Sequence, residues 1–432
     1  MITTIIICAV TVLLMIASIL FFPKLHVKKL HISLYWVIAL AGATVLLIVK
    51  RQYLPAVGSA MIANTAVNPL KILALFISMT FLSIFLDVLG FFRYLASRVL
   101  KRAKTGQMRL FISLYIMVSV LTMFTSNDII ILSFTPFICY FAKNAKIDPI
   151  PFLAAEFVAA NTWSMALLIG NPTNIYLATA NNINFLEYVK VSILPTLAAG
   201  VVAFCMLLIV FHKKLRTPIQ GESESVSIDD KLLLAVGLIH LIACTVLLAV
   251  SSYIGWDMWI ISLCAVGSLI LFNTVIAIVR KRAPAEMLAS LRRVPYELVP
   301  FLISMFAMIV VLAQEGVTTQ IANLLGSSLT VLKYGVTSFF AANVMNNIPM
   351  SVLFSSVIDA SSANSNAAIF ATIIGSNISA FFTPIGALAG IMWSSILRDH
   401  GYKFSYLNFL KMGVLIALPT LFAALGVLML VV

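Results

Sequence analysis

The sequence is poor in charged side chains: Asp, Glu, Lys and Arg make up 10% of its 432 residues, against roughly 25% in soluble domains. That scarcity excludes an ordinary soluble domain and a disordered chain. Cysteine is scarce as well. Its five residues lie in apolar stretches without CxxC spacing, which implies neither a disulfide framework nor a zinc site. HExxH, GxSxG, Walker A and Gly-rich dinucleotide motifs are missing, so we expect no enzyme, no cofactor and no bound metal.

What the chain has is apolar sequence and basic charge. Hydrophobic residues make up 62%, and 28 Lys and Arg against 15 Asp and Glu give a formal net charge of +13. In so apolar a chain this excess is explained by basic cytoplasmic loops, not by a nucleic-acid partner. A barrel would show alternating strands, so the sequence predicts an all-α polytopic protein whose surroundings are the lipid bilayer.

Ten apolar runs are long enough to cross a bilayer, which takes about 20 residues. The first run lacks the basic start of a signal peptide and is interpreted as a retained span. The ten runs lie at residues 2–23, 31–49, 72–92, 149–180, 191–211, 232–251, 257–279, 297–314, 364–397 and 405–432.

Two further apolar segments, 110–142 and 334–358, carry polar residues near their middles, and we expect each arm to be too short to span. If both are re-entrant hairpins, 23 of the 28 Lys and Arg fall on one face and 5 on the other; if each crosses once, the split is 14 to 14. The positive-inside rule therefore favours two hairpins. It also predicts that both termini face outward, with the first hairpin entering from the cytoplasm and the second from outside.

The chain also repeats itself. Ile77-Ser78-Met79 recurs as Ile303-Ser304-Met305, and Pro195-Thr196-Leu197 recurs as Pro419-Thr420-Leu421, at nearly the same offset. Each half then has five crossings and a hairpin, and an odd number inverts the second half, as in secondary transporters. We predict a first repeat at 1–216 with hairpin 110–142 and broken helix 149–180, a cytoplasmic linker at 217–229, and a second repeat at 230–432 with hairpin 334–358 and broken helix 364–397.

Four polar breaks interrupt these apolar segments, a hairpin tip and a Pro-containing helix break in each half. Broken helices that meet at the midplane offer backbone groups and dipole ends to a substrate. The candidate substrate- or ion-binding residues at and beside the breaks are Ser126, Asn127, Asp128, Asn161, Thr162, Asn171, Thr173, Asn174, Asn346, Asn347, Ser376, Asn377 and Thr383.

The strings SNDIIILSFTPF and ANTWSMALLIGNPTN, and later NNIPMSVLF and SNISAFFTPIGALAGIMW, resemble the ion transporter superfamily, with its citrate transporter-like fold and especially its arsenite efflux permease branch. The resemblance covers essentially the whole chain. It implies two inverted repeats, each with a re-entrant hairpin and a broken helix, that work as an elevator-type transporter. By similarity, Asn127 and Asp128 match the first tip of arsenite permeases, and Asn346, Asn347 and Pro349 the second. The Gly170–Asn174 break instead resembles dicarboxylate carriers and the melanosomal P protein.

Ionisable residues at membrane depth are functional candidates by default. Asp128 and Glu156 are the candidates for proton coupling, although Asp128 could only cap a helix and Glu156 could be a snorkelling carboxylate near the interface. We expect Asp87 to be a solvated residue at the end of its span and His240 to donate a hydrogen bond between packed helices. Asn171, Thr173 and Asn174 could alternatively only satisfy backbone groups freed by Pro172.

We therefore expect a secondary active transporter of the prokaryotic plasma membrane that exports arsenite or antimonite by proton antiport. A sodium- or proton-coupled carrier of small carboxylates or other anions, or a sodium/proton antiporter, is the alternative, and a channel is the rival from another class. The partners are a small inorganic or carboxylate substrate and a coupling H⁺ or Na⁺. A homodimer and a separate ATPase subunit stay open.

Overall fold

The computed structural model describes residues 1–21, 24–27, 30–64, 68–102, 106–216, 227–363, 365–402 and 404–432. Within these residues the chain is helical, except for one short antiparallel pair of strands, β1 Lys24–Val27 and β2 Leu30–Ser33, and the connecting turns and loops. The predicted linker 217–229 lies largely outside the described residues, which resume at 227. The all-helical fold expected from the composition is thus observed.

The helices follow the apolar runs. Up to Arg216 they are α1 Ile2–Phe21, α2 Leu34–Val49, α3 Leu54–Ile62, α4 Pro69–Val88, α5 Phe91–Arg102, α6 Gln107–Phe124, α7 Asn127–Asn144, α8 Ile150–Trp163, α9 Pro172–Ala180 and α10 Phe185–Phe211. From residue 227 they are α11 Lys231–Ala249, α12 Ser251–Ile254, α13 Met258–Val279, α14 Ala285–Arg293, α15 Leu298–Gln314, α16 Val317–Leu325, α17 Thr330–Met345, α18 Asn347–Asp359, α19 Ser365–Ser379, α20 Leu388–Asp399 and α21 Tyr406–Val431.

Local signals set several of the helix starts. At α4, Pro69 occupies the first turn, and the side chain of Asn68 accepts hydrogen bonds from the backbone N–H groups of Leu70 and Lys71. At α10, Asn184 and Glu187 form a capping box. Both devices satisfy N–H groups that a helix leaves unpaired at its start.

Within the described residues, seven helices are long and apolar enough to cross a membrane, and α2 with the residues after it forms an eighth candidate bent by 98°. Each of the ten predicted runs coincides with one of these helices, with the shorter α1, or with a helix broken in two. The prediction that every hairpin arm is too short to span is wrong for α6, because its 18 residues meet the length and apolarity required.

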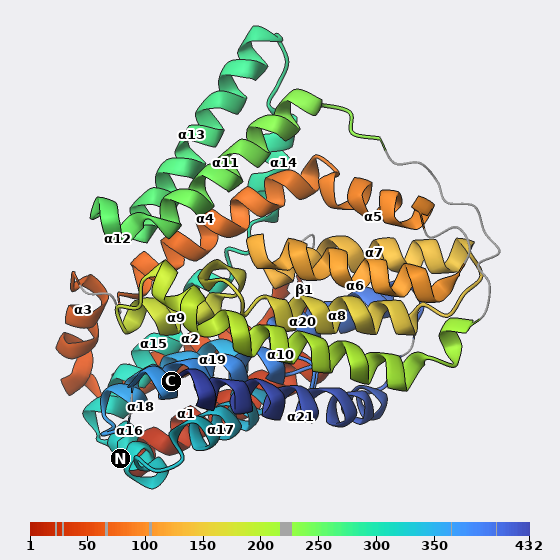
Figure 1. The fold of residues 1–432 in the computed structure, drawn as a ribbon. Helices are drawn as coiled ribbons and strands as arrows, with labels where there is room; N and C mark the ends of the chain where they lie inside the picture. Colours follow the sequence, from red (N-terminus) through yellow and green to blue (C-terminus); the bar gives the residue numbers. More distant parts are fainter. Residues whose placement is uncertain are drawn as a thin grey trace.

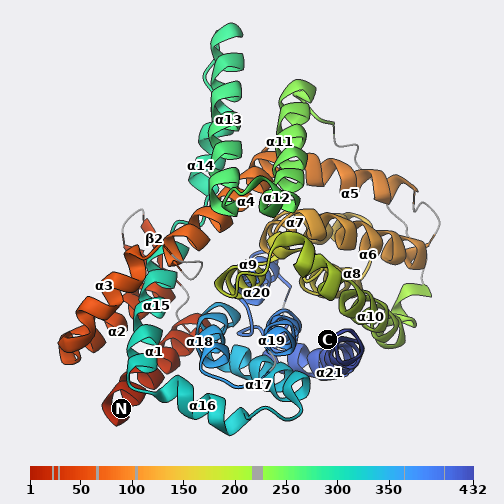
Figure 2. The same ribbon diagram turned by 60° about the vertical axis from the view of Figure 1, so that its left-hand side comes forward.

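The chain reverses at both predicted hairpins. α6 ends at Phe124 and α7 begins at Asn127, and Asn346 alone separates α17 from α18. In Figure 1, α6, α7, α8 and α10 run side by side, with α21 packed against α10, while α17, α18 and α19 lie together toward the lower left. Figure 2 shows α11 and α13 projecting from the body of the fold, where both contact α4.

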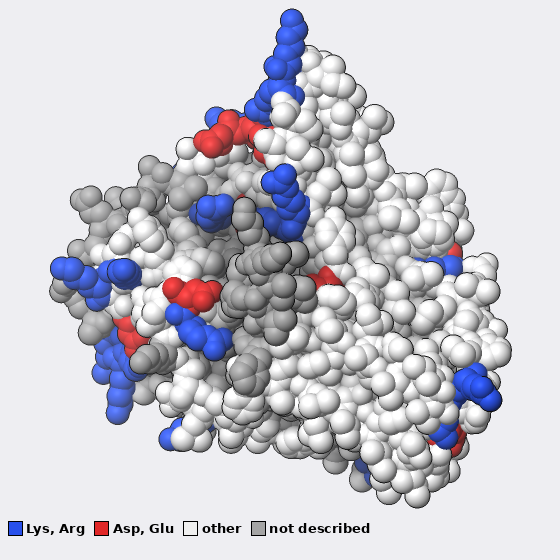
Figure 3. Space-filling model, turned by 180° about the vertical axis from the view of Figure 1, so that it is seen from behind, with Lys and Arg blue, Asp and Glu red and all other residues white. Residues whose placement is uncertain are grey.

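Charged side chains are sparse on the surface. On the face shown in Figure 3, broad areas carry none, and the Lys and Arg that are seen are more numerous toward the left and the top, with others near the middle and at the right edge. His240 joins α11 to α13, since its Nε2 lies 3.1 Å from Ser268 Oγ. Its Nδ1 lies 2.7 Å from the carbonyl oxygen of Val236, which can only accept, so a neutral His240 accepts the bond between the helices instead of donating it as predicted. Asp87 differs from the prediction: it is buried, and Arg293 Nη2 of α14 donates to its Oδ2 at 2.6 Å, because α14 folds back over the end of α4.

Candidate functional site

The first broken helix lies in the N-terminal half of the chain. α8 ends at Trp163, a 3-10 turn covers Leu168–Gly170, and α9 starts at Pro172. A Cβ on Gly170 would stand 2.3 Å from the carbonyl oxygen of Ser164, so the chain passes too close to itself for any side chain there. Asn171 caps α9 by accepting from Thr173 N at 3.1 Å. The break is therefore tightly built rather than frayed.

The second broken helix has the same construction. α19 ends at Ser379, α20 starts at Leu388, and a Cβ on Gly386 would stand 2.2 Å from the carbonyl oxygen of Ser379. Thr383 Oγ1 donates to Asn343 Oδ1 of α17 at 2.6 Å. The loop of the second break is thus fixed to the first arm of the second hairpin.

Asn377 connects the two breaks to each other. Its Oδ1 accepts from Asn171 Nδ2 and from Ser164 Oγ, both at 2.9 Å, and its Nδ2 donates to Asn174 Oδ1 at 2.7 Å. Asn174 Nδ2 in turn donates to the carbonyl oxygen of Ser164 at 2.8 Å. All of these side chains are buried. Segments some 200 residues apart therefore share one amide network.

Each hairpin tip is joined to the broken helix of its own half. Asn127 Nδ2 donates to Asn161 Oδ1 at 2.9 Å, while Asn346 Nδ2 donates to the carbonyl oxygen of Ile385 at 3.2 Å and Asn347 N to that of Gly386 at 3.1 Å. Asn346 has φ of +76° and ψ of 152°, a conformation that is strained for any residue with a side chain. The second tip is therefore held in a demanding geometry by its contacts.

The predicted site residues fall into two groups. In one group the side chains form hydrogen bonds to the breaks or to one another; this group consists of Asn161, Asn171, Thr173, Asn174, Asn346, Asn377 and Thr383. This supports the structural interpretation of the Pro172 region. In the other group a buried polar atom has no partner within the described residues; these atoms are Ser126 Oγ, Asn127 Oδ1, Thr162 Oγ1, Asn347 Oδ1 and Ser376 Oγ. Buried polar atoms are usually paired, so these are the atoms most available to a ligand.

The two acidic candidates have different surroundings. Asp128 is half-buried in the first turn of α7. The N-cap position of α7 is held by Ser126, whose side chain makes no capping hydrogen bond, so Asp128 is not the cap. Glu156 is completely buried, and Thr135 Oγ1 of α7 lies 2.9 Å and 3.1 Å from its two carboxyl oxygens. The interpretation of Glu156 as a snorkelling surface carboxylate is therefore wrong.

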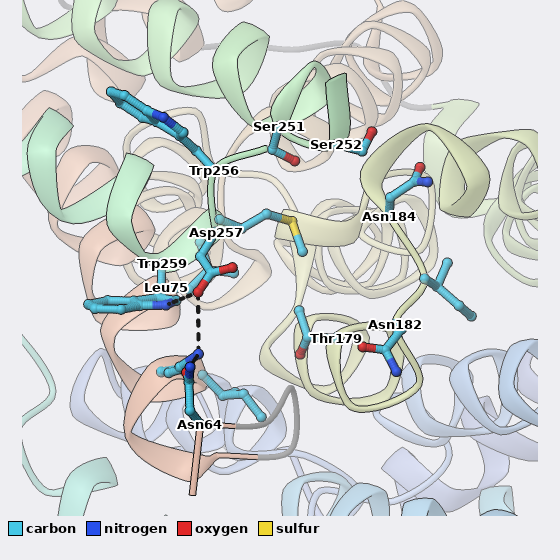
Figure 4. A pocket seen from close by; sticks show the side chains of 14 residues that line it. Asn64, Leu75, Thr179, Asn182, Asn184, Ser251, Ser252, Trp256, Asp257 and Trp259 are labelled. Carbon is cyan, nitrogen blue, oxygen red and sulfur yellow. Dashed lines mark hydrogen bonds and ion pairs between the residues drawn. The ribbon is translucent and has the colours of Figure 1, made fainter. Parts of the chain in front are cut away.

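Two clefts border segments that carry or adjoin this network. The first, of about 370 Å³, lies between α4, the loop after α9 and the start of α13, and is lined largely by polar side chains. Asp257 accepts there from Lys71 Nζ at 3.2 Å and from Trp259 Nε1 at 2.9 Å, as the dashed lines in Figure 4 show. A small gap beneath it, bordered by Ile72, Thr173 and Ile348, has about 10 Å³, room for roughly one water molecule.

The second cleft shares no lining residue with the first. It has about 490 Å³ and is lined by Pro384 and Ile385 of the second break, by Ser394 and Arg398 of α20, and by Tyr402. It therefore reaches the second break directly, whereas the residues of the first break do not line the first cleft. The charge pattern predicts that this second cleft faces the cytoplasm.

Sequence reasoning missed three residues that bond to predicted site residues: Ser164, Asn343 and Thr135. Ser164 stands in the same string as Asn161, and Asn343 lies one helical turn before Asn346, a spacing that could have pointed to them. Thr135 could not be found in this way, because its partner Glu156 lies on another helix. Among the described residues, no group of three or more His, Cys, Asp or Glu could hold a metal ion.

The arrangement places neutral amide and hydroxyl groups at the two breaks and the two tips of a protein made of apolar helices. Discontinuous helices of this kind form the substrate sites of secondary transporters. The fold and site define a membrane transporter, not an enzyme. A model of the citrate transporter family matches residues 33–375, and the chain belongs to that family.

Curated relatives and a solved structure agree with this class. The chain is 27% identical over 371 residues to the arsenical pump membrane protein of Escherichia coli strain K12, covering 82% of this chain and 85% of that one. It is 22% identical over 366 residues to a 46 kDa membrane protein of Mycobacterium leprae, covering 80% and 82%. The structure of the YdaH transporter of Alcanivorax borkumensis matches with a TM-score of 0.55 at 12% identity, over 99% of this chain and 97% of that one. The chain is an integral membrane protein.

Proposed function

We propose that the chain is a secondary active transporter that exports arsenite or antimonite in exchange for protons. The observation that carries this proposal is the buried amide network around Asn377, which joins the two broken helices beside a cleft that reaches the second break. We infer that a solute crosses this centre only when the network changes its contacts, because its side chains are buried and bonded to one another. That requirement favours alternating access over an open channel.

The organisation that we propose for this movement is two inverted repeats, 1–216 and 230–432, joined by a cytoplasmic linker at 217–229. In support, the sequence of hairpin and broken helix occurs once in each part, and the close approach of Gly170 to Ser164 recurs at Gly386 and Ser379. The moving unit of this elevator contains the two hairpins, 110–142 and 334–358, and the two broken helices, 149–180 and 364–397. The location is the plasma membrane, with both termini outside.

The polar atoms without partners favour a neutral hydroxylated substrate. Asn127 Oδ1 and Asn347 Oδ1 are pure acceptors, and the hydroxyls of Ser126, Thr162 and Ser376 both accept and donate. Arsenous acid carries hydroxyl donors for these oxygens, whereas a carboxylate would meet two acceptors that repel it. Asp128, half-buried beside this group at the first tip, is the proposed proton carrier.

A second function has support of its own: sodium- or proton-coupled transport of small carboxylates or other anions. The family description names citrate, and α7 and α18 begin at the two tips, where helix N-termini attract anions. In that arrangement the two amide oxygens would face the coupling cation. A sodium/proton antiporter would use the same oxygens. The proposal itself requires neither a second copy of the chain nor an ATPase subunit.

The test is uptake into everted membrane vesicles that contain the protein, with arsenite, citrate, succinate and sodium supplied separately. We expect arsenite to accumulate when the vesicle interior is made acidic, and not without the gradient. Citrate or succinate uptake driven by sodium, without arsenite uptake, would replace the first function with the second. Conductance too large for alternating access would indicate a channel.

A further inference from the structure

Glu156 is a buried acid without a basic partner. It is 0% exposed, and among the described residues no Lys, Arg or His forms an ion pair with it. Its observed hydrogen bond comes from a single hydroxyl, that of Thr135 on α7. The titratable group that faces it from α7 is Cys139, and Tyr402 lies beyond Cys139. An isolated carboxylate is too costly to bury, so the side chain carries its proton in this conformation.

An unused donor stands next to this acid. The indole N–H of Trp393 on α20 interacts with Glu156, yet no hydrogen bond of normal geometry satisfies it within the described residues. The Trp393 ring is itself completely buried and packs on Phe157 with the ring centres 5.1 Å apart. A buried N–H without an acceptor is unusual. It becomes useful when Glu156 loses its proton, because the carboxylate is then a strong acceptor.

A short path leads from Glu156 to the second cleft. Trp393 of α20 contacts Phe404 edge to face, with the ring centres 5.4 Å apart. Phe404 lines that cleft, and so does Ser394, which follows Trp393 on α20. The hydroxyl of Tyr402, another cleft residue, donates to the carbonyl oxygen of Cys139 on α7 at 3.4 Å. Two residues of the segment between α20 and α21 therefore contact neighbours of Glu156: Tyr402 contacts Cys139, and Phe404 contacts Trp393.

We propose that Glu156 is a second proton-exchange site, separate from Asp128, that opens to the cleft lined by Tyr402 and Phe404. When α20 shifts, Glu156 exchanges its proton with water in the cleft, and Thr135 and Trp393 donate to the resulting carboxylate. When α20 returns, the acid is buried only in its protonated form. The inference rests on the proposed proton antiport. It assigns one of the proton-exchange steps of that antiport to the side of the membrane that the second cleft faces.

The first experiment needs no substrate. Infrared spectra of the purified wild-type protein are compared with those of E156Q across a pH series, with E187Q as a matched control because Glu187 lies in an exposed capping box. We expect a neutral carboxylic acid band at neutral pH that E156Q lacks and E187Q retains. W393F keeps an aromatic ring but removes the N–H donor, so the band should persist to higher pH. Identical spectra for wild type and E156Q would overturn the proposal.

The second experiment tests coupling in proteoliposomes with arsenite. E156Q should exchange arsenite across the membrane without a gradient, as the wild type does, but an imposed pH gradient should no longer drive net flux. Gradient-driven flux at the wild-type level in E156Q would overturn the role in coupling. If the wild type itself moves no arsenite, the proposed function fails, and the infrared comparison still decides whether Glu156 holds the proton.

Discussion

The amide of Asn171 donates a 2.9 Å hydrogen bond to the side-chain oxygen of Asn377, which joins the two broken helices of the molecule. The same oxygen accepts from Ser164, and the amide of Asn377 donates to Asn174. One side chain in the second half thereby satisfies three in the first half. Its removal should affect the whole centre of the protein.

Asn377→Ala should lower the stability of the folded protein markedly. The change leaves a buried donor unpaired on Asn171 and a buried acceptor unpaired on Asn174, at a cost of about 1 to 3 kcal/mol for each group, whereas Ser164 keeps its bond to the carbonyl oxygen of Asn161. The measurement is the thermal unfolding midpoint in detergent. Because Asn171→Ala removes the other end of one bond, the double variant should lose less than the sum of the two single variants. Asn181→Ala, at a half-buried helix end, is the control, and an equal loss there would contradict the interpretation.

Asn347→Ala should weaken substrate binding with little effect on stability. It removes a buried oxygen that has no partner within the described residues, whereas the backbone N–H that bonds to Gly386 stays. We expect the apparent dissociation constant to rise about 3- to 100-fold, as for one lost hydrogen bond. Substrate-dependent thermal stabilisation measures it. Asn273→Ala is a matched control, since Asn273 is a buried asparagine on α13 whose amide has no hydrogen-bond partner within the described part of the chain. Unchanged affinity in the Asn347 variant would place the ligand elsewhere.

Asp128→Asn should abolish gradient-driven transport and leave substrate exchange intact, because an amide cannot release a proton. The side chain does not cap α7, so loss of a cap would not explain such a result. Net flux and counterflow in proteoliposomes separate the two activities. If net flux in the variant keeps the pH dependence of the wild type, Asp128 does not carry the proton.

Asp230→Asn should cost stability at neutral pH but not in acid. Burial works to raise the pKa of Asp230, but the N–H of Leu233 and the guanidinium groups of Arg280 and Arg282 outweigh it and hold that pKa below its usual value. The stabilisation is therefore present above about pH 4 and is lost as the pH falls below it. Because Asn can still cap α11, only the two half-exposed ion pairs with Arg280 and Arg282 are lost. We expect the free energy of unfolding to fall by about 0.2 to 1 kcal/mol for each pair.

Thermal unfolding of wild type and Asp230→Asn over a pH series checks this prediction. Asp229→Asn, at the exposed neighbouring residue, is the control. If the difference in unfolding midpoint between wild type and Asp230→Asn stays the same in acid as at neutral pH, the charge of Asp230 contributes nothing to stability.

Much of the fold could be predicted from the sequence, because apolar runs, Pro172 and the tip asparagines are local signals. The network could not be predicted, because an asparagine in a break looks the same whether its amide bonds to another break or stays unpaired. Only the three-dimensional structure distinguishes Asn377, whose amide bonds to Asn174, from Asn347, whose side-chain oxygen has no partner within the described residues. Asp87 and Glu156 were misjudged for a related reason: nearness to the end of a span does not reveal that α14 or α20 folds over it.

The shared network also has a consequence for biosynthesis. Asn171 and Asn174 enter the membrane about 200 residues before Asn377 is made, so their amides wait without their final partner while the ribosome completes the chain. The first half alone should therefore be a substrate for quality-control proteolysis. Produced together from two genes, the halves should rescue each other, since each supplies the hydrogen bonds that the other lacks.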